Sequence, residues 1–388
     1  QLANGSNALR GICITPDGKY IYVSHNLGRF TVPTSQLQQG WMNTSAFSVI
    51  DVDKQEFLGA IVVDEPERGA AGIWSIACND ESVFISHSGT HEVSVIDHKA
   101  MLEKFLNYPN KAVLDYDLTF LYGLRERIPL EGNGPRNMIL NGDKLIIPTY
   151  FADILNIMDI NTNEVTSVEL NPGREETAEN KGERYFNDAS HCFQNWQSCN
   201  GCHPGDARTD GMNWDLMNDG VGNSKNCKSM LFSHMTPPNM ISGIREHAER
   251  AVRAGFNFIQ FFEVSEEDAA CVDAYLKSLR PVPSPYLVNG ELSDLAKEGQ
   301  KVFEKLKCGE CHSGVYYTDM KYHRIGEDIE FEKGWDTPTL REVWRTAPYL
   351  FDGRAATMKE VFSVHKHGIE KKVSEKDIEA LTEYVNSL

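Results

Sequence analysis

The chain has 388 residues, which is too long for one ordinary hydrophobic core, so we expect two or three domains. Its 56 acidic residues against 38 basic ones give a formal net charge of −18, which repels nucleic acids and anionic membrane surfaces, so we expect no nucleic-acid partner. No stretch approaches the 18 or more apolar residues of a membrane span, so we expect no transmembrane segment.

The N-terminal part, to about residue 173, is predicted to be β-structure. GICITPDGKYIYVSHN, from residue 11, alternates apolar and polar positions about a Pro-Asp-Gly turn, as a half-buried hairpin does. The same pattern returns in VFISHSGTHEVSVID and in LIIPTYFADILNIMDINTNEVTSVEL. About three copies of one four-stranded unit are therefore present, and such copies are typical of the blades of a β-propeller.

These repeats resemble the YVTN family of propellers over roughly residues 8 to 172. The resemblance implies a ring of blades, and propellers usually close with four to eight of them. Three blades leave the ring open. We therefore expect either a missing N-terminal segment or a partner chain to complete the propeller.

After residue 173 the sequence changes to glycine turns, predicted helices and cysteines, among them two Cys-x-x-Cys-His motifs. SCNGCHPG contains Cys199, Cys202 and His203, and KCGECHSG contains Cys308, Cys311 and His312. In this pattern the two thiols form thioether bonds to a haem, and the histidine binds its iron. A redox dithiol or half of a zinc site is the alternative, but a zinc site would need a second Cys or His pair close by.

The haem region is an internal duplication. The interval from Cys199 to Cys308 is the same as the interval from SEEDAACVDAYLKSL, which begins at residue 265, to SEKDIEALTEYVNSL, which begins at residue 374. Each half ends in an amphipathic helix. The predicted fold class is therefore multidomain, with an incomplete β-propeller of about three blades (1–173) followed by two mainly α-helical cytochrome c domains (174–285 and 286–388).

Both haem motifs together with TPTLREVWRTAPYLFDGRAATMKEVF resemble the bacterial di-haem cytochrome c peroxidase superfamily, which includes the maturation enzyme of methylamine dehydrogenase. The resemblance covers about residues 183 to 388. It implies two covalently bound haem c groups, of which one reacts with peroxide and the other relays electrons. Phe351 departs from the pattern, because many relatives carry His there.

The sixth iron ligand decides which haem does which task, since a haem with two strong protein ligands shuttles electrons and an open position accepts peroxide. Carrying the alignment of the two halves onward places His365 against Gly255 and His367 against Asn257, so only the second half has candidate ligands there. We favour His367, which precedes Gly368, with His365 as the near alternative. The C-terminal haem is then the relay.

For the first haem, His234 in LFSHMTPPNM is a candidate for sixth ligand or distal acid/base, and a hydrogen-bonded loop histidine is its alternative. Glu263, after the aromatic run FNFIQFF, is a second candidate for proton transfer, and a surface carboxylate is its alternative. Trp214 and Trp335 lie where the family places residues between the haems, so either ring could assist electron passage or simply pack.

The family resemblance also implies a calcium ion, held by Asn226 and by carbonyls near Asp336 and Pro338, since hard oxygen ligands suit calcium. Three cysteines of the C-terminal part lie outside the haem motifs: Cys192, Cys227 and Cys271. A disulfide among them is allowed in an oxidising compartment. Two more cysteines, Cys13 and Cys78, lie in apolar strands and are expected to be buried packing residues.

Two functions compete. In the first, electrons pass from the C-terminal haem to a peroxidatic N-terminal haem, which reduces hydrogen peroxide or another small oxidant. In the second, the chain is a non-catalytic electron-transfer cytochrome whose propeller docks it into a larger redox complex. Either way, the expected partner is a redox protein that donates or accepts electrons, and the expected location is periplasmic, extracellular or at the cell surface.

Overall fold

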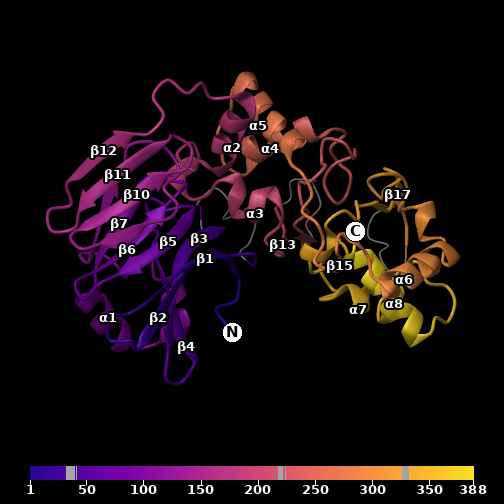
Figure 1. The fold of residues 1–388 in the computed structure, drawn as a ribbon, viewed down its shortest axis with the longest axis horizontal. Coiled ribbons are helices and arrows are strands. Elements are labelled where there is room, and N and C mark those ends of the chain that lie inside the picture. Colours follow the sequence, from indigo (N-terminus) through magenta and orange to yellow (C-terminus); the bar gives the residue numbers. More distant parts are fainter. Residues whose placement is uncertain (32–39, 41, 217–221, 223, 326–331) are drawn as a thin grey trace. The chain divides into compact units, whose positions relative to one another are not determined.

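A computed structural model describes residues 1–31, 40, 42–216, 222, 224–325 and 332–388 (Figure 1). By the contacts between their backbones, the residues fall into two sets. Unit 1 contains residues 1–204 and 256–272, and unit 2 contains residues 205–255 and 273–388. Each unit is described by itself, and the three predicted domain ranges stay a prediction.

Unit 1 contains three antiparallel sheets of four strands, each in consecutive order. The strands of the first sheet are β1 (Ser6–Ile14), β2 (Tyr20–Gly28), β3 (Asn43–Asp51) and β4 (Glu56–Val62). Those of the second are β5 (Ile73–Cys78), β6 (Ser82–His87), β7 (Glu92–Asp97) and β8 (Arg125–Pro129). Those of the third are β9 (Ile139–Asn141), β10 (Lys144–Thr149), β11 (Ile154–Asp159) and β12 (Val165–Glu169).

The first hairpin forms where the Pro-Asp-Gly turn predicts it. Gly18 has a φ of +73°, which glycine adopts without steric cost, and its N–H donates to the Thr15 carbonyl at 2.8 Å. The turn pairs Ile14 with Ile21 and Cys13 with Tyr22. This register buries Tyr22, which is 0% exposed, and leaves Ile14 54% exposed on the other face.

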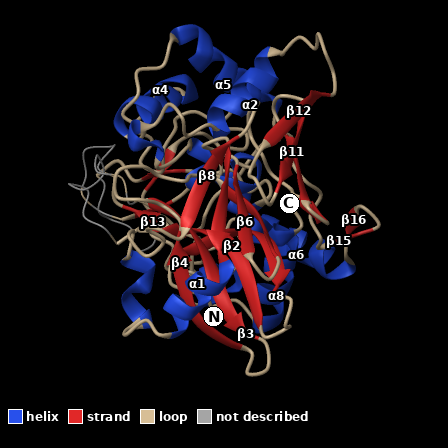
Figure 2. Ribbon diagram, turned by 90° about the vertical axis from the view of Figure 1, so that its left-hand side faces the viewer, coloured by secondary structure: helices blue, strands red, loops and turns tan. Residues whose placement is uncertain are grey.

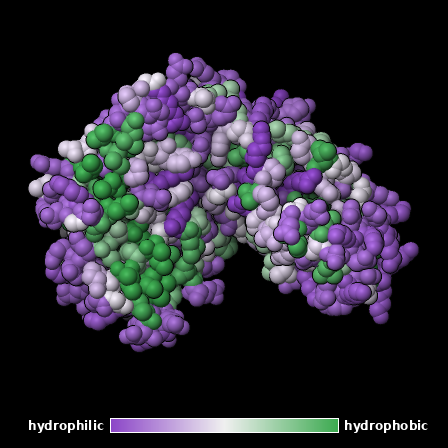
Figure 3. Space-filling view, in the orientation of Figure 1, coloured by the Kyte–Doolittle hydropathy of each residue, from purple (hydrophilic) through white to green (hydrophobic). Residues whose placement is uncertain are grey.

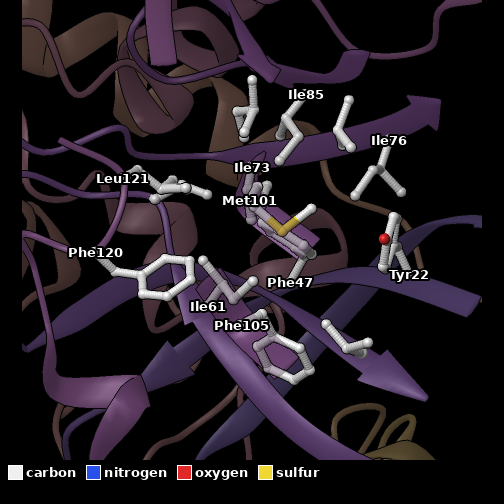
Figure 4. Packing of buried hydrophobic residues seen from close by; sticks show 14 of the residues in the cluster. Tyr22, Phe47, Ile61, Ile73, Ile76, Ile85, Met101, Phe105, Phe120 and Leu121 are labelled. Atoms are coloured by element: carbon white, nitrogen blue, oxygen red, sulfur yellow. The ribbon is translucent and has the colours of Figure 1, made fainter. Parts of the chain in front are cut away.

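Apolar side chains of the first and second sheets share one core, shown in Figure 4. Its largest members are aromatic, and they include Tyr22, Phe47, Phe105 and Phe120. Phe105 comes from α1 (His98–Leu106), which follows β7 and is capped by the Asp97 side chain. A second cluster joins β6, β7, β10 and β11. Hydrophobic residues also form a band on the surface over the strands (Figure 3).

The remaining chain has short helices joined by long loops, as Figure 2 shows. The helices are α2 (Ala178–Asn187), α3 (Pro204–Ala207), α4 (Ala248–Phe258), α5 (Glu266–Ser278), α6 (Asp294–Lys305), α7 (Met358–Ser363) and α8 (Glu375–Asn386). Unit 2 also has three two-stranded sheets, formed by β13 (Asn213–Trp214) with β14 (Lys225–Asn226), β15 (Leu287–Val288) with β16 (Glu291–Leu292), and β17 (Tyr322–His323) with β18 (Trp335–Asp336).

The predicted fold class was wrong. The described chain consists mostly of small antiparallel sheets and has about 26% helix, and two mainly α-helical cytochrome c domains are not seen. The closing amphipathic helices form as α5 and α8, but much of the chain around the helices stays in turns and loops, where glycine and proline interrupt helices. The three four-stranded sheets match in number the repeats that the sequence analysis counted.

The internal duplication is visible in the elements. Isolated antiparallel bridges join Asn239 to Arg245 and, at the matching place in the second half, Tyr349 to Ala355. The short 3₁₀ turns at Cys199–Gly201 and Cys308–Glu310 are separated by the same interval as the starts of α5 and α8. Among the described residues, no helix has the length and apolar character that crossing a membrane requires.

Candidate functional site

The second Cys-x-x-Cys-His motif lies in unit 2, just after α6. Cys308–Glu310 form a 3₁₀ turn, and the His312 N–H donates to the Cys308 carbonyl at 2.9 Å. The Nδ1 atom of His312 lies 3.2 Å from the Tyr317 carbonyl, so Nδ1 carries the proton and donates it. The Nε2 lone pair is then available for a metal, the usual arrangement for a ligating histidine.

His367 faces His312. The centres of the two imidazole rings are 6.3 Å apart, with 50° between their planes. Two imidazoles on opposite sides of one metal ion, each bonded at about 2 Å, have ring centres about 6 Å apart. Desolvation, and next the neighbouring His312, lower the pKa of His367 to about 4, so its ring is neutral and able to ligate at neutral pH.

The segment after α7 holds His367 in place. Thr357 and Glu360 form a capping box that fixes the start of α7. The helix ends at Ser363, and the His367 N–H then donates to the Val361 carbonyl at 3.1 Å. The structure places the other candidate, His365, on the same turn without a described contact to His312, so the ring geometry favours His367.

The first motif lies in unit 1 with the same local turn. The His203 N–H donates to the Cys199 carbonyl at 3.0 Å, which matches the second motif. Burial raises the pKa of Cys199 to about 12, so the free thiol is protonated. Both motifs therefore present two cysteines and a histidine in the spacing and turn that covalent haem attachment uses, and their residues fit a haem c.

Two residues that the sequence analysis did not single out contact the first motif. The Asn43 side chain, at the start of β3, donates to Cys202 Sγ at 3.2 Å. The Gln260 side chain donates to Cys199 Sγ at 3.1 Å. Gln260 is a polar residue inside the aromatic run FNFIQFF, so the sequence offered a signal that could have singled it out. Asn43 lies far from the motif in the sequence and gave none.

His234 lies in unit 2 with its side chain only 1% exposed. Its Nε2 atom is 3.0 Å from Asp273 Oδ1, and its Nδ1 atom is 3.3 Å from Ser233 Oγ. Asp273 also accepts from Arg253. Both ring nitrogens are therefore engaged, which is the geometry of the hydrogen-bonded loop histidine that was the alternative to an iron ligand or acid/base.

Trp214 and Glu263 differ in their surroundings. Trp214 is buried on β13, and its Nε1 donates to Asp210 Oδ2 at 2.9 Å. Burial raises the pKa of Asp210 to about 7, because its effect outweighs that of the hydrogen bonds to Asp210, which lower the pKa. Glu263 is exposed. Asp210 is thus a buried carboxyl that can hold a proton at neutral pH, and the sequence analysis did not select it.

Trp335 and Phe351 form a stacked pair with ring centres 4.2 Å apart and 15° between planes. The Phe351 side chain therefore has a packing contact. Near it, the N–H of Asn226 donates to the Phe351 carbonyl at 2.6 Å, while its Oδ1 atom is buried without a hydrogen-bond partner. An unpartnered carbonyl oxygen fits a hard cation such as calcium.

The surroundings of the predicted calcium ligands also carry a positive charge. The Asp336 carboxylate pairs with Lys228 Nζ at 2.9 Å. Across the described ranges, no three or more His, Cys, Asp or Glu side chains are grouped to hold a metal ion. The calcium site stays a prediction, supported by the Asn226 oxygen alone.

The chain is similar in sequence to two subunits of one enzyme. It is 27% identical over 272 residues to hydrazine synthase subunit gamma from Kuenenia stuttgartiensis, a match covering 53% of this chain and 76% of the relative. It is 25% identical over 149 residues to subunit beta of the same enzyme, covering 37% of this chain and 38% of that one. No family model matches the sequence.

Two solved structures are also similar to parts of this chain. A chain of hydrazine synthase from Kuenenia stuttgartiensis superposes with a TM-score of 0.50 at 23% identity, over 56% of this chain and 89% of that chain, and this likeness concerns the fold. A MauG-like protein associated with microbial copper homeostasis has a TM-score of 0.44 at 18% identity, over 57% of this chain and 91% of that chain. The propeller resemblance is not confirmed by these comparisons.

Proposed function

We propose that this chain is a redox protein with two haem c groups. Cys199 and Cys202 would tether the first haem, and Cys308 and Cys311 the second. The observation that carries the proposal is the facing pair of His312 and His367, whose ring centres are 6.3 Å apart. A haem supplies one-electron transfer when both axial positions hold imidazole, and peroxide reduction when one axial position is open.

His203 and His312 would be the proximal ligands of the two irons. His312 is oriented for this by its hydrogen bond to the Tyr317 carbonyl. If His367 also held the iron of the second haem, that site would serve as the electron relay. We infer that the first site would receive two electrons from the second site and use them, with two protons, to reduce hydrogen peroxide to two molecules of water.

The proton donors of that reaction come from the candidates of the first half. Glu263 is exposed and can exchange protons with solvent. His234 would act only after leaving its contact with Asp273, since both ring nitrogens are engaged. Trp214 would take part through its ring, because its Nε1 proton is held by Asp210.

A second candidate function is an electron-transfer subunit of a larger redox complex. The similarity to two different subunits of one enzyme, gamma and beta, favours it. In that case a partner redox protein, rather than peroxide, exchanges electrons with the first haem. Covalent haem attachment further supports a periplasmic or cell-surface location for either function, as an expectation from the chemistry of the motif.

The first experiment tests the ligands. The intact mass of the purified chain should exceed the polypeptide mass by two haems, and His367→Ala should convert one low-spin signal in the electron paramagnetic spectrum into a high-spin signal. His365→Ala, on the same turn, is the matched control and should leave the spectrum unchanged. A mass without haem refutes the proposal. If His365→Ala alone alters the spectrum, the assignment of His367 as the relay ligand is wrong.

The second experiment separates the two functions. Peroxide added to the fully reduced holoprotein should be consumed, with each haem giving up one electron, if the first site is peroxidatic. Two six-coordinate haems that peroxide leaves unchanged would instead establish the carrier. Glu263→Gln should then lower the rate of peroxide consumption without changing the haem spectra, and an unaltered rate removes Glu263 from the reaction.

A further inference from the structure

Two cysteines outside the haem motifs face each other in unit 1. Cys13 is on β1 and Cys78 is the last residue of β5, and their Sγ atoms are 3.6 Å apart. Sequence analysis placed both as buried packing residues, but both are half-buried. The two strands belong to different sheets, since β1 is an edge strand of the first sheet and β5 of the second.

The backbones of β1 and β5 lie close together along their length. The Arg10 side chain donates to the Ile73 carbonyl at 2.9 Å, near the start of β5. Further along, Gly11 leaves no room for a side chain, because a Cβ there would lie 2.7 Å from the Trp74 carbonyl oxygen. The cysteine pair continues this alignment, so the fold itself brings the two sulfur atoms together.

We propose that Cys13 and Cys78 are a redox-active thiol pair that closes to a disulfide between the first and second sheets. A disulfide bond measures about 2.05 Å, so the sulfur atoms at 3.6 Å must approach by about 1.5 Å to form one. The contact between Cys78 Sγ and the Ile14 carbonyl, 3.4 Å long, is exposed to solvent. An oxidant can therefore reach Cys78.

The hydrogen bond between the two thiols decides which of them reacts first. The contact with Cys13 lowers the pKa of Cys78, while the pKa of Cys13 is raised, first by that contact and then by burial. The thiolate is the nucleophile in disulfide exchange, so Cys78 reacts first.

The oxidant is a small disulfide. The Cys78 thiolate attacks one of its sulfur atoms, forms a mixed disulfide and releases one thiolate. Cys13 then attacks the Cys78 sulfur, gives its proton to the solvent, and displaces the second small thiolate. In total, two protein thiols lose two electrons and two protons, and the small disulfide gains them to become two thiols.

The test uses the full haem-loaded chain and oxidised glutathione as the small disulfide. After incubation, quenching and trypsin digestion, the peptide of residues 11–19 should be joined to the peptide of residues 69–99, because each contains one cysteine, Cys13 or Cys78. The joined mass should be about 2 Da below the sum of the two peptides. Dithiothreitol should separate them again.

Variants distinguish the roles of the two thiols. Cys13→Ser should stop at the mixed disulfide and carry one glutathione on Cys78, whereas Cys78→Ser should be modified at least tenfold more slowly. Cys192→Ser is the control and should still form the joined peptide. Separate peptides in the oxidised wild-type chain, or a bond from Cys13 to another cysteine, would overturn the proposal, and neither result bears on the haem sites.

Discussion

A buried ion pair in unit 2 offers the sharpest stability prediction. Arg208 Nε and Nη2 lie 2.7 and 3.0 Å from the two carboxylate oxygens of Glu342, and the side chains are only 4% and 1% exposed. Glu342 also accepts from the Val282 N–H, while Arg208 donates to the Arg280 carbonyl at 3.0 Å. The pair thus ties the segment after the first haem motif to the linker and to the second half.

Glu342→Gln should cost about 3–5 kcal/mol of unfolding free energy, because it removes the negative charge that faces the buried Arg208 guanidinium. The glutamine NH₂ group would also face an N–H donor, because three N–H groups point at the two carboxylate oxygens of Glu342. The double variant Arg208→Met with Glu342→Leu should recover part of this loss, because no charge is then left buried.

Urea unfolding followed by circular dichroism measures these differences in the holoprotein. Glu298→Gln, which breaks an exposed pair with Lys301, is the control and should cost less than about 1 kcal/mol. The reasoning fails if Glu342→Gln costs no more than this control, or if the double variant is less stable than Glu342→Gln alone.

Three further outcomes are expected. Burial raises the pKa of Asp210 from the ordinary value of 3.8 to about 7. Its protonated form therefore contributes stability that is fully present below pH 3.8 and is lost as the pH rises through about 7. The infrared band of the protonated carboxyl should fade with that midpoint, and Asp210→Asn should lack the band. A Cys13–Cys78 disulfide closes a long loop of the chain and should raise the unfolding free energy by about 4 kcal/mol in urea, an effect that dithiothreitol should remove. Gly11→Ala should cost about 1–3 kcal/mol, because its Cβ would lie 2.7 Å from a backbone carbonyl oxygen of β5, whereas Gly255→Ala has open space and should cost nothing in the same titration.

The sequence predicted those parts of the molecule that follow local patterns. Alternating apolar residues and the turn at Gly18 predicted the strands. The constant interval between the two halves predicted the duplication, which is visible in the matching 3₁₀ turns. The rings of His367 and His312 face each other, and the role of His367 as an iron ligand stays a prediction.

The rest depended on contacts between segments far apart in the sequence. The bond from His234 to Asp273 spans 39 residues, and the contact of Asn43 with Cys202 spans 159. Neither partner follows a motif, so only the folded chain brings them together. The mainly helical fold class was wrong for a related reason: two regular closing helices suggested more of the same in segments that glycine and proline keep in loops.

The place of the first haem motif within unit 1 has a practical consequence for anyone dissecting this chain. Because Asn43 of β3 donates to Cys202, a fragment that started at residue 174 would strip one attachment cysteine of its neighbour. Deleting the N-terminal strands would therefore change the surroundings of the proposed first haem as well as the scaffold. Spectra of such a truncated protein would describe a different environment of Cys202 from the one in the whole chain.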